Sequence, residues 1–217
     1  MPLLSESPLA VYALAIALAA FLLFLVQPIA GRMLLPWFGG GPAVFSVCLC
    51  FFQCALLVGY GYAHLLSQRP RRVQVMGHVA LLLVALLTPG LVPGADSRPS
   101  ADAAAATGIL SILLVYVGPA FVLLAATSPL LQHWIAITGR SPYRLYALSN
   151  LASMAALFAY PLVIEEHLGL AAQGRAFRAL QVAFVVASIA AAVVTWRGVD
   201  GPKEQPRAPA GRGLPRR

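Results

Sequence analysis

Apolar residues fill six long stretches of this chain, and short polar segments separate them. Each stretch is close to the roughly 20 residues that an α-helix needs to cross the hydrocarbon core of a membrane. The pattern therefore predicts an all-α membrane protein with six transmembrane helices. The six predicted spans are residues 8–31, 43–66, 73–91, 108–130, 145–164 and 177–196. The third is the shortest, and its outer end, at Thr88-Pro89-Gly90, is the least well defined.

Composition excludes a water-soluble fold. Of the 217 residues, 60% are hydrophobic and only 10% are charged, whereas soluble domains average about 45–50% and 25%. The first stretch is also unlike a cleavable secretory signal, because its apolar run is too long and Glu6 stands where basic residues are expected. We expect it to remain as a membrane helix.

The basic residues predict the orientation of the chain. Six spans place both termini on one side, and cytoplasmic termini put eleven of the 15 Lys and Arg residues inside, as the positive-inside rule requires. Six of them fall at the end of the chain, so we predict a membrane domain over residues 1–197 and a disordered basic cytoplasmic tail over 198–217. The same distribution argues against a nucleic-acid partner, because no folded polar surface is left to array the charges.

An unusual segment rich in Pro and Gly, residues 27–42, follows the first span. Pro28 is expected to kink or end the first helix, and three glycines before Pro42 permit a tight reversal. We predict a re-entrant or interfacial segment here, with an ordinary hydrophobic loop as the alternative. Gln27 and Arg32 are its candidate functional residues, and Arg32 either reaches the lipid headgroups or holds an anionic group.

The second span carries a stripe of small residues, Ala55, Gly59 and Ala63, which favours close helix packing in lipid. The remaining candidate functional positions are polar residues in the second and fifth spans. They are Gln53, Tyr60, His64 and Asn150.

Catalytic and cofactor chemistry finds little support in the sequence. Cys48, Cys50 and Cys54 are interpreted as packing residues, since four ligands for a zinc ion do not converge near them. His64 and His78 leave axial haem ligation as a minor alternative, but we predict no cofactor, no metal and no catalytic residue. No ionisable residue lies in the middle of a span, which argues against a proton-coupled pump.

Three groups of residues resemble the membrane half of the bacterial fused transmembrane and spermidine-synthase-like proteins. They are residues 24–32 with 35–40, residues 42–45, 51–53 and 59–64, and residues 141–143 with 145–150. The resemblance implies a bacterial cytoplasmic membrane. Members of that family commonly continue into a Rossmann-type catalytic domain, for which this chain shows no glycine-rich turn. The resemblance therefore implies that the chain is not an enzyme. It implies instead a non-catalytic membrane module that anchors or serves a soluble synthase-like partner. The alternative is a small-solute permease or transport subunit, for which polyamines are one candidate substrate. The bilayer and a second copy of the chain are the other partners expected.

Overall fold

A computed structural model describes residues 7–94, 97, 104–138 and 141–199. Their regular structure is helical, with no strand among them. The α-helices are α1 (Ser7–Phe38), α2 (Pro42–Ser67), α3 (Arg71–Leu86), α4 (Ala105–Ile112), α5 (Gly118–Ala136), α6 (Tyr143–Ala159), α7 (Glu165–His167) and α8 (Leu170–Val199). Two π-helical segments, η2 (Leu113–Val117) and η3 (Tyr160–Ile164), join α4 to α5 and α6 to α7. The predicted tail lies outside the described residues, except for positions 198 and 199, which end α8.

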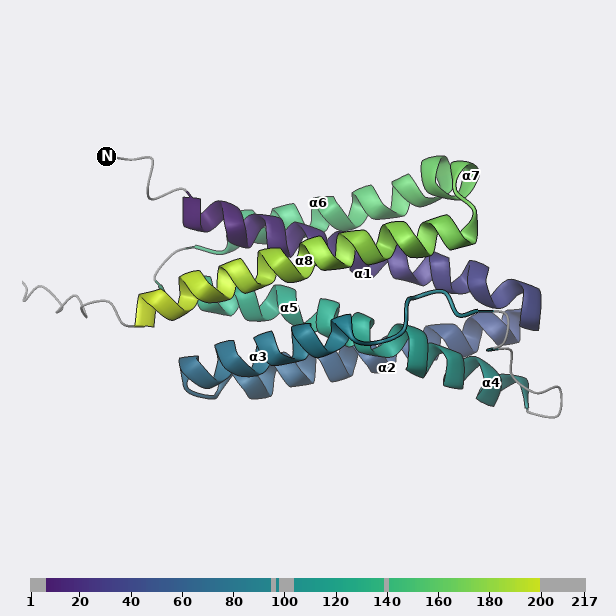
Figure 1. The fold of residues 1–217 in the computed structure, drawn as a ribbon, viewed down its shortest axis with the longest axis horizontal. Coiled ribbons are helices and arrows are strands. Elements are labelled where there is room, and N and C mark those ends of the chain that lie inside the picture. Colours follow the sequence, from purple (N-terminus) through teal and green to yellow (C-terminus); the bar gives the residue numbers. More distant parts are fainter. Residues whose placement is uncertain (1–6, 95–96, 98–103, 139–140, 200–217) are drawn as a thin grey trace, which may run out of the picture.

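Five helical runs are long and apolar enough to cross a membrane. They are Leu9–Phe38, Pro42–Ser67, Ala105–Ala136, Tyr143–His167 and Leu170–Gly198. The predicted third span differs, because α3 has only 16 residues and is about 24 Å long at 1.5 Å per residue. Successive long helices alternate in direction along the bundle, and α1 begins at the end of the bundle where α8 finishes (Figure 1).

The first helix does not break at Pro28. The structure continues α1 through Pro28 and Pro36 to Phe38, so residues 33–38 are its last turns and not a segment separate from it. A proline within a membrane helix removes one backbone donor, and its neighbours can satisfy the freed carbonyl. The freed carbonyl is that of Phe24, four residues back. At the same place the hydroxyl of Tyr160 donates to the Pro28 carbonyl at 3.3 Å, which joins η3 to α1.

The glycines after α1 make the turn that the sequence predicts. Gly39 has a φ of +75° and its N–H donates to the Leu35 carbonyl at 2.9 Å, which is a common helix ending. Pro42 then stands in the first turn of α2, where its missing N–H leaves no intrahelical bond unmade.

A proline accompanies each π-helical segment. Pro119 is the second residue after η2, and Pro161 lies within η3. The Gly118 N–H donates to the Leu113 carbonyl, and the Glu165 N–H to the Tyr160 carbonyl, five residues back in each case. A widened turn of this kind relieves the clash between a proline ring and the preceding turn of the helix.

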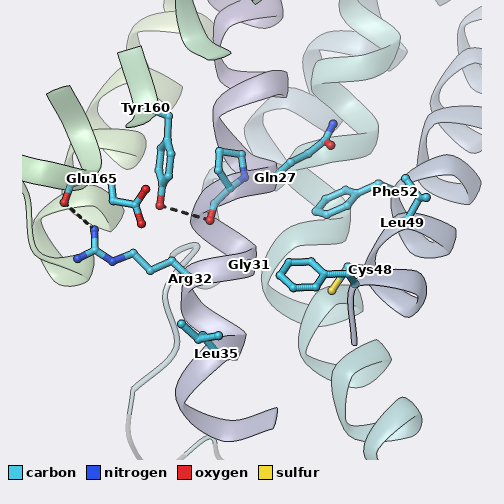
Figure 2. Close-up of a pocket in the computed structure, with 11 residues that line it drawn as sticks. Gln27, Gly31, Arg32, Leu35, Cys48, Leu49, Phe52, Tyr160 and Glu165 are labelled. Atoms are coloured by element: carbon cyan, nitrogen blue, oxygen red, sulfur yellow. Dashed lines mark hydrogen bonds between the residues drawn. The ribbon is translucent and has the colours of Figure 1, made fainter. Parts of the chain in front are cut away.

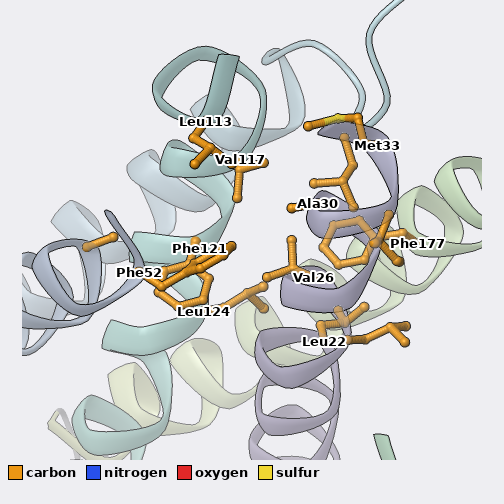
Figure 3. Close-up of a cluster of buried hydrophobic side chains, with 14 of the residues drawn as sticks. Leu22, Val26, Ala30, Met33, Phe52, Leu113, Val117, Phe121, Leu124 and Phe177 are labelled. Atoms are coloured by element: carbon orange, nitrogen blue, oxygen red, sulfur yellow. The ribbon is translucent and has the colours of Figure 1, made fainter. Parts of the chain in front are cut away.

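The centre of the bundle is α1, which packs mainly against α8, α6 and α5 and touches its sequence neighbour α2 little. Large apolar side chains of α1, α2, α5 and α8 meet here, together with residues of η2 (Figure 3). In contrast, α6 buries only a small part of its surface. The buried members of this cluster that Figure 3 labels are Leu22, Val26, Ala30, Met33, Phe52, Leu113, Val117, Phe121, Leu124 and Phe177.

Candidate functional site: a groove along α1

One face of α1 lines two pockets that follow each other along the helix. Its residues at the pockets are spaced three or four apart, so that they share a face. Residues of α2 contribute to both pockets; α5 and α6 complete one of them, and η3 with α7 completes the other. We call this arrangement the α1 groove. The α1 residues along it are Ala20, Leu23, Phe24, Gln27, Pro28, Gly31, Arg32 and Leu35.

The first pocket, which we name the Tyr60–Asn150 pocket, has a volume of about 450 Å³. It lies between α1, α2, α5 and α6 and brings together two residues, Tyr60 and Asn150, that are 90 positions apart in the sequence. Its lining combines apolar side chains with several hydroxyl and amide groups. The polar residues are Tyr60, Ser128, Ser149, Asn150 and Ser153.

Most of these polar groups are not used inside the protein. Ser153 donates its hydroxyl to the Ser149 carbonyl at 3.0 Å. The side chains of Tyr60, Ser128, Ser149 and Asn150 make no hydrogen bond to any other residue that the structure describes. Asn150 lies seven residues into α6, about 10 Å along the helix. At that depth an unpartnered amide is costly, because lipid tails offer no hydrogen bonds.

The small-residue stripe of α2 positions this pocket. Gly59 is buried against α5, where a Cβ atom would stand 2.8 Å from both the Val122 carbonyl oxygen and the Ala125 Cβ. Ala55 and Ala63 are buried on the same side of α2. The close contact of α2 with α5 places the adjacent Tyr60 at the edge of the pocket, with its side chain 52% exposed.

The second pocket, the Arg32–Glu165 pocket, lies at the other end of the α1 groove and has a volume of about 370 Å³. Figure 2 shows Arg32 extending from α1 toward the start of α7. Its Nη1 donates to the Glu165 carbonyl at 3.1 Å and to the Leu168 carbonyl at 3.3 Å. Tyr160 stands beside these groups, and Gln27 also lines the pocket.

The structure brings four of the six candidate polar positions together in two pairs and leaves the other two apart. Gln27 and Arg32 line one pocket, and Tyr60 and Asn150 line the other. Gln53 is exposed on α2 and lines neither of them. His64 is exposed near the end of α2, where its Nε2 lies 2.9 Å from Nε2 of Gln68.

A buried polar cluster that sequence reasoning did not identify joins α2, α3 and α5. His78 Nε2 lies 3.1 Å from the Thr127 hydroxyl, and its Nδ1 lies 3.4 Å from the Tyr62 hydroxyl. Both ring nitrogens of His78 are therefore engaged within the protein, which leaves neither available for the haem ligation considered above. Across the described part of the chain, no three His, Cys, Asp or Glu side chains gather as a metal site would require.

These features define an all-α protein whose long apolar helices are those of a multi-pass membrane protein. No protein-family model, curated protein or solved structure matches the chain.

Proposed function

We propose that the chain binds a small uncharged solute inside the membrane, in the Tyr60–Asn150 pocket, as a permease or transport subunit. The observation that carries the proposal is the set of four polar side chains that converge on this pocket without a partner among the described residues. A ligand with hydrogen-bonding groups would satisfy them. The pocket volume, about 450 Å³, falls in the range of small-molecule sites.

The lining also bears on the charge of the solute. None of the residues around the Tyr60–Asn150 pocket is ionisable near neutral pH. A polyamine carries several positive charges, and moving them into this part of the membrane without a carboxylate would be expensive. The pocket therefore favours a neutral solute over the polyamine that the family resemblance suggests.

The proposed topology has six crossings, with both termini in the cytoplasm of a bacterial cell. The third crossing combines α3 with the residues that follow it. At 30 residues, the span Leu9–Phe38 is about 45 Å long, which exceeds the roughly 30 Å of hydrocarbon. The last turns of α1, with Trp37, then form an interfacial segment at the outer surface.

Flux into proteoliposomes tests the proposal. Stopped-flow light scattering with glycerol and urea should show faster entry than into empty vesicles, and radiolabelled putrescine should not enter. Asn150→Leu and Tyr60→Phe should lower the glycerol and urea rates. Gln53→Leu is the matched control, because Gln53 lies outside both pockets, and it should leave them unchanged.

Two outcomes would contradict a solute pocket. The first is a rate for glycerol and urea equal to that of empty vesicles. The second is a change of oligomeric state in Asn150→Leu, measured by multi-angle light scattering, because a second copy would then be what covers the pocket.

The second candidate function is that of a membrane module that serves a soluble synthase-like partner. It is supported by exposed arginines at the end of the bundle where α1 begins and α8 finishes (Figure 1). Arg69 follows α2, Arg144 opens α6 and Arg197 lies near the end of α8. A partner with an acidic surface would fit this end.

Affinity purification from native membranes tests the second candidate. A synthase-like protein should be recovered with the wild type and lost when Arg69 and Arg144 are both replaced by Glu. Replacement of Arg175, at the opposite end of the bundle, should retain it. Recovery of no synthase-like protein with the wild type would contradict this function.

A further inference from the structure

The Arg32–Glu165 pocket holds two opposite charges that do not pair with each other. Arg32 donates hydrogen bonds from its Nη1 to the backbone carbonyls of Glu165 and Leu168. The Glu165 carboxylate makes no hydrogen bond or ion pair with another residue of the described ranges. One positive and one negative group therefore border the same cavity, and each retains capacity for an external partner.

The side of the pocket formed by α2 and the end of α1 is largely apolar. Leu35, Phe45, Leu49 and Phe52 line it, and Phe45 and Leu49 are each more than half exposed. In a membrane, Phe45 and Leu49 face lipid, while Phe52 forms the buried floor of this side. The pocket thus combines a charged end with an apolar side. This arrangement is complementary to an amphiphilic ligand and not to a soluble zwitterion without an apolar part.

The position of the charges along the bundle also fits a headgroup. Arg32 is six residues from the end of α1, and Glu165 begins α7 after the last turn of η3. Both lie near the end of the bundle opposite the start of α1 (Figure 1). In the proposed topology this is the level of the outer headgroups.

We infer that this pocket binds a zwitterionic phospholipid with a primary ammonium, phosphatidylethanolamine, through Arg32 and Glu165. The guanidinium binds the phosphate, for which arginine is well suited. The Glu165 carboxylate accepts a hydrogen bond from the ammonium, and an acyl chain lies along Leu49 and Phe52. Phosphatidylglycerol lacks the ammonium, and the methylated ammonium of phosphatidylcholine has no N–H to donate.

Two features distinguish this site from an arginine that merely reaches the interface. The two carbonyl bonds hold Arg32 to the segment that carries Glu165, so the two residues stay side by side at the pocket. Gly31 leaves room beside them, because a Cβ atom built there meets nothing within 4 Å. The inference is independent of the solute proposed for the Tyr60–Asn150 pocket.

Native mass spectrometry of the delipidated full chain, titrated with single phospholipids, tests the site. The wild type should bind phosphatidylethanolamine more tightly than phosphatidylglycerol or phosphatidylcholine. Glu165→Gln should lose this preference, by about tenfold for one hydrogen bond between charged groups. Glu166→Gln, its exposed neighbour outside the pocket, is the matched control and should keep the preference.

Further variants separate binding from folding. Arg32→Gln should lose affinity for all three lipids, and Arg32→Lys should retain part of it if the positive charge attracts the phosphate. Gly31→Leu should fill the pocket and weaken binding while leaving the melting temperature close to that of the wild type. Equal affinity of the wild type for the three lipids, or equal behaviour of Glu165→Gln and Glu166→Gln, would overturn the inference.

A competition experiment shows whether the bound headgroup belongs to a membrane lipid or to a soluble molecule. Soluble glycerophosphoethanolamine should fail to displace the lipid at equal concentration, since it lacks the acyl chain that contacts the apolar wall. Displacement as effective as that by the lipid itself would overturn the assignment to a membrane lipid.

Discussion

Trp134 donates its indole N–H to the side-chain oxygen of Gln74 at 2.7 Å, and both residues are buried. The amide nitrogen of Gln74 in turn donates to the carbonyls of Ser67 and Arg69, at 3.0 and 2.7 Å. One side chain of α3 therefore joins α5 to the end of α2 and the turn after it. It also satisfies backbone carbonyls that a helix end leaves without partners.

Replacing Gln74 with Leu should lower the free energy of unfolding by about 1–3 kcal/mol, because the buried Trp134 N–H would lose its acceptor. Thermal unfolding in detergent measures the effect. Gln53→Leu removes an exposed glutamine of the same size and should be nearly neutral. Equal melting temperatures of the two variants would show that the Gln74 contacts add no stability.

Thr127→Val should also destabilise the bundle, by about 1–3 kcal/mol, because His78 Nε2 would be left buried without its partner. Valine has nearly the same shape as threonine, so the loss of stability measures the contribution of the Thr127 hydroxyl. Thr107→Val, in an exposed position of α4, is the control. The measurement is the melting temperature of each purified variant, and a Thr127 variant as stable as the control would contradict the expectation.

Gly59→Ala should destabilise the protein, because its methyl group would stand 2.8 Å from a carbonyl oxygen of α5. Changes that overpack an interface cost about 1–3 kcal/mol. Gly61→Ala adds the same group two residues away, where nothing lies within 4 Å, and alanine there favours the helix. We expect the two variants to differ in sign by thermal unfolding. Similar stability would place α2 farther from α5 than described.

Gly39→Val should reduce folded yield, because Gly39 alone among the described residues combines a turn position with a positive φ. A side chain in this conformation costs about 1–2 kcal/mol. Gly41→Val is the control, since its backbone is extended and its Cβ position is open. Yield and monodispersity by size-exclusion chromatography compare them. Equal yields would argue against the turn.

The predicted topology can be tested with single cysteines in a chain whose Cys48, Cys50 and Cys54 are replaced by Ala. A membrane-impermeant maleimide applied to intact cells should label Gly41→Cys and Gly90→Cys but not Gln68→Cys. Labelling of position 41 alone would mean that the third pass does not cross the membrane. Labelling of position 68 alone would invert the whole orientation.

The apolar pattern predicted the all-α fold, and five of its six predicted spans coincide with helices long enough to cross a membrane, because length and hydropathy are local properties. The third predicted span contains only the 16-residue α3. The pattern misplaced the end of the first helix. Pro28 and the Trp-containing turn after it suggested a break, yet α1 continues to Phe38 and is contacted at the Pro28 carbonyl by Tyr160, a residue 132 positions away. No local signal in the sequence announces such a partner.

The candidate site shows the same division. Polarity within an apolar helix pointed to Asn150 and Tyr60 separately, but only the packing of α2 on α5 and α6 on α1 brings them to one pocket. Gln53 and Asn150 are equally conspicuous in the sequence as polar residues within apolar helices. They differ in the structure because Asn150 lies on the face of α6 that lines a pocket, whereas Gln53 lies on a face of α2 that lines neither pocket. Glu165 was not among the candidate positions, because its relation to Arg32 depends on the turn between α7 and α8.

The central place of α1 has a consequence for how the protein is made. Its main packing partners, α5, α6 and α8, are synthesised long after it, and α2, which follows it directly, touches it little. After leaving the translocon, α1 must therefore remain a solitary helix in the bilayer until the ribosome has delivered most of the chain. Arg32 is the single ionised side chain of α1. An isolated α1 can therefore stay in the lipid bilayer before its packing partners are made. Assembly of the described bundle is then completed only after α8 has been made.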